Sequence, residues 1–286
     1  MLWSTILNRL GGILATVLLL VVIGAAAGVW IGVPYLERRW LFFPVKESRE
    51  QPWQVPEGAE VVTFATADGV RLGGWFLGAT GPRRGVTILT LHGNFGVLPR
   101  YMADAELLRR NGFNVLLFNY RGFGISGGIT ESEATLNLDA MAALRYLTQA
   151  RGLDPTSIAF VGASLGAPVA ATLATQAPCH AVALISTIAS ARRQAQRDWP
   201  WLPRFVLAGL RSPFDTAGEI GRARCPVAVV HGSKDQVVPV AQAYEVYAAA
   251  RPPKRLIVVP EAAHGVSAAD DPTYLDGLIT FLTDPS

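Results

Sequence analysis

The chain has 286 residues, which suits one large domain with an appendage. Hydrophobic residues make up 50% of it and charged residues 16%, a composition that excludes intrinsic disorder and suggests contact with a membrane. There are 25 Lys and Arg against 22 Asp and Glu, and this net charge of +3, without basic clusters, excludes nucleic acid as a partner.

The first predicted element is a transmembrane anchor over residues 10–36. This range holds no charged residue, and about 20 apolar residues in a helix are enough to cross a bilayer. Aromatic residues that prefer the membrane interface lie near its ends: Trp3, Trp30, Tyr35 and Trp40. A signal peptide cleaved near Ala27 is the alternative, but the apolar run continues past that point to Val33. We therefore expect a single-pass membrane protein with an N-terminal anchor.

The side of the membrane stays open at this point. Arg9 alone precedes the anchor, whereas four basic residues follow it: Arg38, Arg39, Lys46 and Arg49. This asymmetry favours a cytoplasmic catalytic domain. A folded domain can nevertheless be translocated despite its charges, so the count does not decide the orientation.

Residues 37–58 contain three prolines and mixed charges, which predicts a linker that lifts the soluble part off the membrane. The domain that follows covers residues 59–286. It opens with two β-rich runs, Glu60–Thr66 and Val70–Leu77, whose Asp-Gly connection predicts an antiparallel hairpin.

Short apolar runs then alternate with longer helical patterns. The further predicted strands are Val86–Leu91, Phe113–Phe118, Ser157–Val161, Ala181–Ile185, Val227–Val230 and Arg255–Val259. The predicted helices are Met102–Arg110, Ser132–Ala150, Leu165–Gln176, Val240–Ala250 and Pro272–Leu282. Buried strands with helical crossovers indicate an α/β fold whose mostly parallel sheet is covered on both faces.

Residues 187–224 interrupt this alternation and are interpreted as a short lid inserted between strands. The segment contains Trp199, Trp201 and an apolar, helix-like run, Phe205–Leu210. The two tryptophans could equally pack on the helices of the sheet as ordinary core.

A candidate nucleophile lies in the run Gly162-Ala163-Ser164-Leu165-Gly166, directly after a predicted strand and before a helix rich in small residues. A tight strand-to-helix turn exposes such a serine above the sheet, and its flanking glycines avoid clashes. The helix N-terminus behind it favours developing negative charge. We predict that Ser164 is a nucleophile; a purely structural turn is the alternative.

A nucleophilic serine needs a base and an acid that orients the base, and in this arrangement they follow in the order Ser, acid, His. Asp235 and His264 each lie in a loop after a predicted strand. Because these strand ends meet at one edge of the sheet, Ser164, Asp235 and His264 should converge there.

The loop His92-Gly93-Asn94-Phe95-Gly96 follows a predicted strand where an oxyanion hole is expected. The proposed donors are the main-chain amides of Asn94 and Leu165. Phe95 is expected to shape the substrate pocket. We interpret His92 and His231, each of which precedes a glycine, as structural loop residues.

Two further patterns are not interpreted as ligand sites. Gly122–Gly127 matches G-x-G-x-x-G, but the helical pattern starts only near Glu131 and no acidic residue follows at the ribose-binding distance. Cys179 and Cys225 lack metal-ligand spacing, so neither a metal nor another cofactor is expected, and whether they pair stays open.

Together these motifs resemble the α/β-hydrolase superfamily over about residues 60–283. They are Leu91-His92-Gly93-Asn94, the Tyr120-Arg121-Gly122 loop, Gly162–Gly166, His231–Pro239 and His264. The anchor, short lid and Tyr-Arg-Gly loop resemble the membrane-anchored serine hydrolases of the ABHD group. Asn119 departs from the pattern, since relatives usually carry Asp before Tyr-Arg-Gly.

The resemblance implies a Ser-His-Asp hydrolase of esters, thioesters or amides. The apolar lid and the anchor favour carboxylic esters or thioesters of a lipophilic acyl substrate. A peptidase or amidase of the same fold and a catalytically silent membrane scaffold are the alternatives, while acyl length and oligomeric state stay open.

Overall fold

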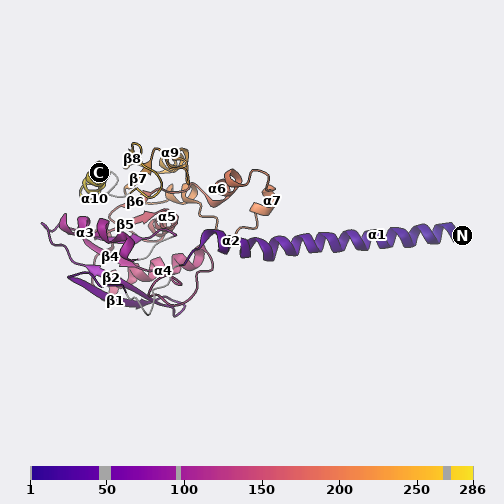
Figure 1. Ribbon diagram of the computed structural model, residues 1–286, viewed down its shortest axis with the longest axis horizontal. Coiled ribbons are helices and arrows are strands. Elements are labelled where there is room, and N and C mark those ends of the chain that lie inside the picture. The colour runs from indigo at the N-terminus through magenta and orange to yellow at the C-terminus, as the bar shows by residue number, and fades with distance from the viewer. Residues whose placement is uncertain (1, 45–52, 95–97, 267–271, 286) are drawn as a thin grey trace.

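The computed structural model describes residues 2–44, 53–94, 98–266 and 272–285 (Figure 1). The strands are β1 (Ala59–Ala65), β2 (Arg71–Leu77), β3 (Thr87–Leu91), β4 (Asn114–Phe118), β5 (Ile158–Ala163), β6 (Val182–Ile185), β7 (Val227–Gly232) and β8 (Lys254–Val259). They form one sheet in the order β1-β2-β4-β3-β5-β6-β7-β8, with β2 antiparallel to both its neighbours and the other pairs parallel. The predicted mostly parallel sheet is confirmed.

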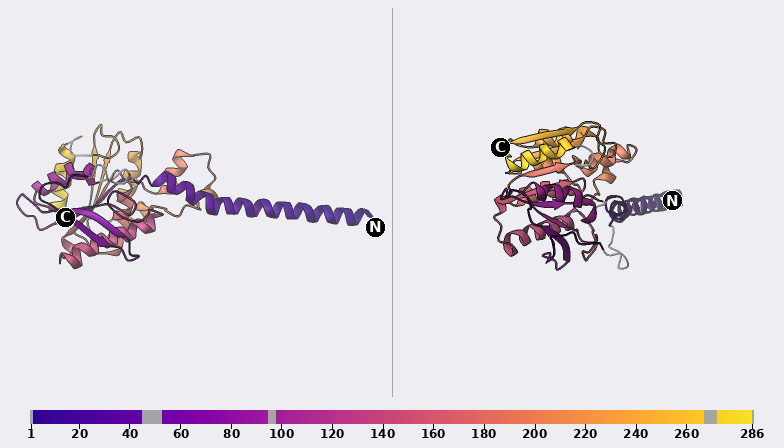
Figure 2. Two further views of the ribbon diagram at one scale, coloured as in Figure 1. Left: turned by 60° about the horizontal axis from the view of Figure 1, so that its bottom comes forward. Right: turned by 60° about the vertical axis from the view of Figure 1, so that its left-hand side comes forward.

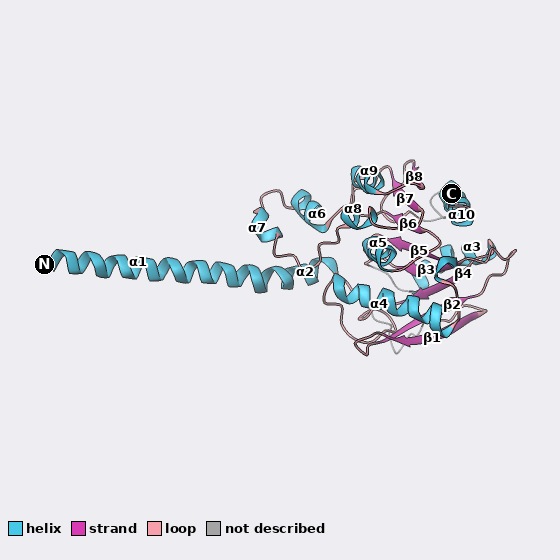
Figure 3. Ribbon diagram, turned by 180° about the vertical axis from the view of Figure 1, so that it is seen from behind, coloured by secondary structure: helices cyan, strands magenta, loops and turns pink. Residues whose placement is uncertain are grey.

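Helices cover both faces of the sheet. The helices of the domain are α3 (Met102–Arg110), α4 (Glu133–Arg145), α5 (Gly166–Gln176), α6 (Ala191–Asp198), α7 (Arg204–Leu207), α8 (Thr216–Ile220), α9 (Val240–Ala249) and α10 (Pro272–Thr283). Figure 3 shows α4, α5, α8 and α9 on one face and α3 and α10 on the other. A separate buried cluster lies under each layer. Strands β6 and β7 are therefore buried at every position, as their unbroken apolar sequences predict.

One helix within the described ranges, Arg9–Arg39, is long and apolar enough to cross a membrane, judged by length and composition. It is built from α1 (Leu2–Ala27), a π-helical turn (Gly28–Gly32) and α2 (Val33–Leu41), and it projects away from the domain (Figure 1). None of its apolar window is buried.

The connection after this helix differs from the predicted linker. Helix α2 continues to Leu41, five residues into the range 37–58. Phe42 is then buried in the core, where its ring meets that of Phe214 with centroids 6.3 Å apart. The domain thus packs directly on the end of the helix, because Phe42 and Leu41 have apolar surface to bury.

Only part of the predicted lid, residues 187–224, stands away from the buried core of the domain. Phe214, which precedes α8, and Ile220 at the end of α8 belong to the main buried cluster. Helices α6 and α7 stand further out, and Trp201 is 76% exposed. The alternative that Trp201 packs as ordinary core is therefore wrong, whereas Trp199 is half-buried.

A disulfide bond joins Cys179 and Cys225, whose Cα atoms are 6.0 Å apart. It links the segments that lead into β6 and β7, which are neighbouring strands. The question that the sequence left open is thereby answered in favour of pairing.

Candidate active site

Ser164 lies at the sharp turn between β5 and α5, with a backbone φ of +50°. Few residues other than glycine adopt this region, so the surrounding packing must hold it there. The flanking glycines allow that packing. A Cβ atom on Gly162 would lie 2.4 Å from the Gly166 carbonyl oxygen, and one on Gly166 would lie 2.0 Å from the Leu91 carbonyl oxygen.

The structure brings the three predicted side chains together at the carboxyl edge of the sheet. The Nε2 atom of His264 lies 3.0 Å from Ser164 Oγ, and its Nδ1 atom lies 2.8 Å from Asp235 Oδ2. With the ring proton on Nδ1, His264 donates to Asp235 and accepts from the Ser164 hydroxyl. The arrangement can withdraw a proton from Ser164.

The Asp235 carboxylate is buried yet held in its charged form. Burial would raise its pKa, but hydrogen bonds from His231, His264 and the Val238 amide outweigh burial and hold the pKa well below its usual range. Oδ1 accepts the main-chain N–H groups of Val237 and Val238 at 2.9 and 2.8 Å. A fixed negative charge thus faces the imidazole.

His231 contacts Asp235, and sequence reasoning did not predict this contact. Its Nε2 atom lies 3.2 Å from Asp235 Oδ2 and 2.8 Å from the Val238 carbonyl oxygen. Since that carbonyl can only accept, Nε2 carries the proton. The four-residue spacing between His231 and Asp235 at the end of a strand was the available signal.

The proposed oxyanion loop lies beside Ser164. A Cβ atom on Gly93 would be 3.4 Å from Ser164 Cβ, and the Gly93 N–H donates to the Tyr101 hydroxyl at 2.8 Å. The Asn94 side chain accepts the N–H of Phe43, the second residue after α2, at 2.9 Å. Sequence reasoning found neither partner, since each contact pairs a side chain with a main-chain N–H group that any residue type can supply. Phe95, the predicted pocket residue, lies outside the described residues.

His92 supports this loop from inside the protein. Its Nδ1 atom lies 2.8 Å from the Gly93 carbonyl oxygen, and its Nε2 atom accepts the Tyr120 N–H at 3.1 Å. The interpretation of His92 as a structural residue agrees with these contacts. Burial lowers its pKa to about 4, because charging an enclosed ring is unfavourable.

We expect this pKa to make stability depend on pH. His92 has a pKa of about 6.5 in the unfolded chain and about 4 in the folded chain. As pH falls between these two values, the unfolded chain binds the proton and the folded chain does not, so the free energy of unfolding decreases. The loss should reach about 3 kcal/mol. Denaturant unfolding at pH 7 and pH 4 should show a steeper decline for the wild type than for His92→Gln, whose amide can supply the same donor and acceptor. Parallel declines would contradict the assignment.

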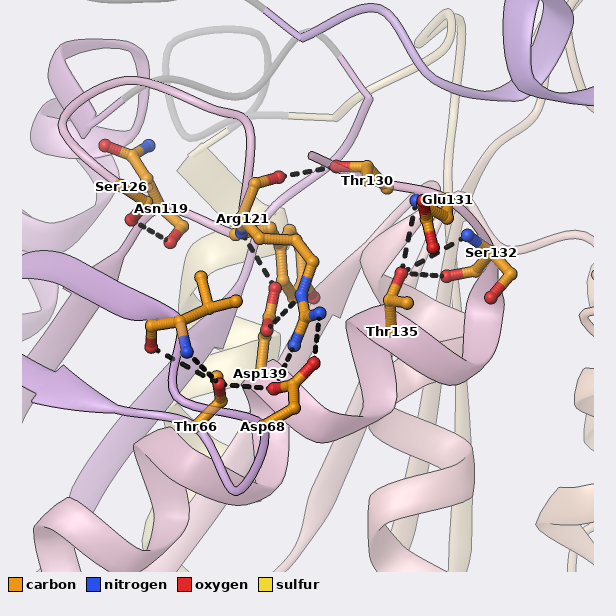
Figure 4. A network of polar contacts seen from close by, with 12 residues as sticks. Thr66, Asp68, Asn119, Arg121, Ser126, Thr130, Glu131, Ser132, Thr135 and Asp139 are labelled. Atoms are coloured by element: carbon orange, nitrogen blue, oxygen red, sulfur yellow. Dashed lines mark hydrogen bonds and ion pairs between the residues drawn. The ribbon is translucent and has the colours of Figure 1, made fainter. Parts of the chain in front are cut away.

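Arg121, in the glycine-containing loop after β4, is buried and forms the centre of an ion network with buried Asp139 and exposed Asp68 (Figure 4). Its Nε atom donates to Asp139 Oδ1 of α4 at 2.8 Å, and its terminal nitrogens donate to Asp68 in the β1–β2 turn at 2.7 and 3.0 Å. The guanidinium thus joins a helix, a hairpin and the loop. Helix α4 begins only at Glu133, six residues after Gly127, which agrees with rejecting a nucleotide site here.

Comparisons with known proteins agree with this fold. A family model described as alpha/beta hydrolase fold matches residues 86–216. The uncharacterized protein Rv2307c of Mycobacterium tuberculosis is 37% identical over 255 residues, which are 89% of this chain and 88% of that protein. The uncharacterized protein YfhR of Escherichia coli K12 is 30% identical over 260 residues, 87% of this chain and 88% of that protein.

Solved structures give the same result at lower identity. The esterase Pf2001 of Pyrococcus furiosus has a TM-score of 0.68 and 24% sequence identity, covering 83% of this chain and 98% of its own. The fold and the family model agree. The chain belongs to the α/β-hydrolase superfamily.

Proposed function

We propose that this protein is a membrane-anchored serine hydrolase that cleaves carboxylic ester or thioester bonds of a lipophilic acyl substrate. The observation that carries the proposal is the unbroken hydrogen-bonded series from Ser164 through His264 to a charged Asp235. The esterase Pf2001, which shares the fold, supports ester chemistry by analogy.

In the proposed reaction, Ser164 Oγ attacks the acyl carbonyl carbon while His264 Nε2 takes the hydroxyl proton. The main-chain amides of Asn94 and Leu165 donate to the oxyanion of the tetrahedral intermediate. His264 then protonates the departing alcohol or thiol, which leaves an acyl-enzyme. Water, deprotonated by His264, attacks this ester, and the acid departs as Ser164 regains its proton.

The two alternatives predict different chemistry. A peptidase or amidase would prefer amide substrates, and the same triad serves both. A catalytically silent scaffold has no need of a charged, buried carboxylate aimed at an imidazole, so the Asp235–His264 contact favours an enzyme.

The disulfide bears on which side of the membrane the domain occupies. Bonds such as Cys179–Cys225 persist in oxidising compartments and are rare in the cytosol. We therefore propose that the domain lies on the oxidising side, although the Lys and Arg count favours the cytoplasm. The charge count does not prevent this placement, because folded domains are translocated despite their charges.

A fluorophosphonate probe, which reacts with activated serines, tests the proposal. Membranes with the wild type should be labelled, and those with Ser164→Ala should not. Ser157→Ala, directly before the opposite end of β5, is the matched control and should label normally. A charged probe that does not cross membranes should label intact cells if the domain lies outside the cytosol. A folded, unlabelled wild type would favour the silent scaffold.

A further inference from the structure

The lid exposes two large apolar side chains, Trp201 and Phe205. They are 76% and 68% exposed. Each square ångström of apolar surface left in water costs about 25 cal/mol, so a pair of exposed rings on a short segment calls for a covering partner. The position of the segment indicates which partner covers it.

The lid runs along the predicted membrane anchor. A Cβ atom on Gly209 would lie 3.1 Å from Val29 Cγ1, and the Arg211 N–H donates to Glu37 Oε2 at 2.8 Å. Figures 1 and 2 show α7 beside the helix, near the point where α1 passes into α2. The two lid residues thus contact anchor residues that lie about 12 Å apart, the rise of eight helical residues from Val29 to Glu37.

This contact fixes the depth of the lid. Residues 10–29 rise about 30 Å, the thickness of the hydrocarbon core, so Val29 lies at the edge of that core and Arg38 and Arg39 lie about 14 Å outside it, toward the domain. Helix α7 ends only two residues before Gly209, which touches Val29. Trp201 and Phe205 thus lie at the membrane interface, where aromatic rings are favoured.

The charge of the lid agrees with that location. Residues 187–224 contain seven arginines and three acidic residues, a net charge of +4, whereas the whole chain carries +3. Arg204, next to Phe205 on α7, is exposed. Apolar rings beside an excess of arginine are typical of surfaces that bind anionic bilayers.

From these contacts we infer that the lid is a second membrane contact, which inserts Trp201 and Phe205 into the bilayer interface beside the anchor. The inference rests on the proposed membrane anchoring and specifies the substrate class, an acyl ester dissolved in the bilayer.

Both membrane-facing elements are tied to the active site. Helix α6 of the lid contacts the Asp235 loop, since the Arg197 guanidinium donates to the carbonyl oxygens of Val237 and Gln236 at 2.8 and 3.0 Å. The anchor reaches the oxyanion loop through the bond from Phe43 to Asn94 at 2.9 Å. The inferred lid contact therefore places the loops that carry Asp235 and Asn94 next to the membrane, and on this inference a lipid ester reaches Ser164 from the bilayer between lid and anchor.

Fluorescence quenching tests the contact independently of catalysis. The full chain, carrying W3F, W30F and W40F to silence the anchor, is placed in vesicles of phosphatidylcholine and phosphatidylglycerol with brominated acyl chains. We expect bromine to quench Trp201, and W201F to remove that quenching. W75F, at a buried position in β2, is the matched control and should leave it unchanged. Equal quenching with and without Trp201 overturns the inference.

Turnover then tests the substrate class. In W201S/F205S, hydrolysis of a long-chain ester in vesicles should fall about tenfold, while a water-soluble butyrate ester should be cleaved within about twofold of the wild-type rate. V61S/Y244S, which removes two other exposed apolar side chains, is the control and should lose neither. Equal losses on both substrates overturn the bilayer route. If the wild type cleaves no ester, the proposed function fails, whereas quenching still decides the lid contact.

Discussion

Replacing His264 with alanine is expected to lower kcat for an acyl ester by about 10⁶-fold, or about 8 kcal/mol of transition-state stabilisation. The Ser164 hydroxyl would remain, but among the described residues His264 is the only side chain hydrogen-bonded to it, so its proton acceptor would be lost. His264 is also the group that returns a proton to the leaving alcohol, so both halves of the reaction would slow. Turnover of a chromogenic ester by wild type and variant measures the effect.

The matched control is His180→Ala. His180 contacts the Leu282 carbonyl oxygen at 2.9 Å. It lies just before β6, at the end of the parallel strands opposite the catalytic loops. This variant should keep wild-type kcat within about threefold, as expected for a substitution remote from the site. A decline of less than tenfold in His264→Ala would contradict the role assigned to His264.

Most of the sheet could be predicted because its strands are short apolar runs with breaks between them. Val227–Val230 is buried on both faces, so its sequence needs no alternation and stands out. Helix α6 could not be predicted in this way, because Ala191–Asp198 is mostly polar. It is held by long-range hydrogen bonds, such as those from Gln194 to the Val237 carbonyl oxygen and from Gln242 to Gln194.

In the candidate site, too, some residues could be predicted from the sequence and others could not. Ser164, Asp235 and His264 could be found because each follows a strand, and parallel topology brings strand ends to one edge. The contacts that hold the proposed oxyanion loop could not be found in this way. Tyr101 acts through its hydroxyl on the Gly93 N–H, and Phe43 acts through its own N–H, so neither contact leaves a pattern in the residue types.

Asp235→Asn is expected to lower kcat by about 10⁴-fold at neutral pH while leaving the fold intact. The surroundings decide how an asparagine must lie. The N–H groups of Val237 and Val238 both point at Oδ1, so the amide oxygen takes that position and the NH₂ group takes the position of Oδ2.

In that orientation the asparagine donates toward His264 Nδ1, and the imidazole must carry its proton on Nε2. Such a ring can no longer accept the Ser164 proton, which accounts for about 5.5 kcal/mol of lost stabilisation. Steady-state kinetics and the ¹⁵N shifts of His264 would measure the rate and the tautomer together. Asp276→Asn, at an exposed position on α10, is the control and should change neither. A tautomer on Nδ1 with a low rate would show that Asp235 acts through its charge rather than by orienting the ring.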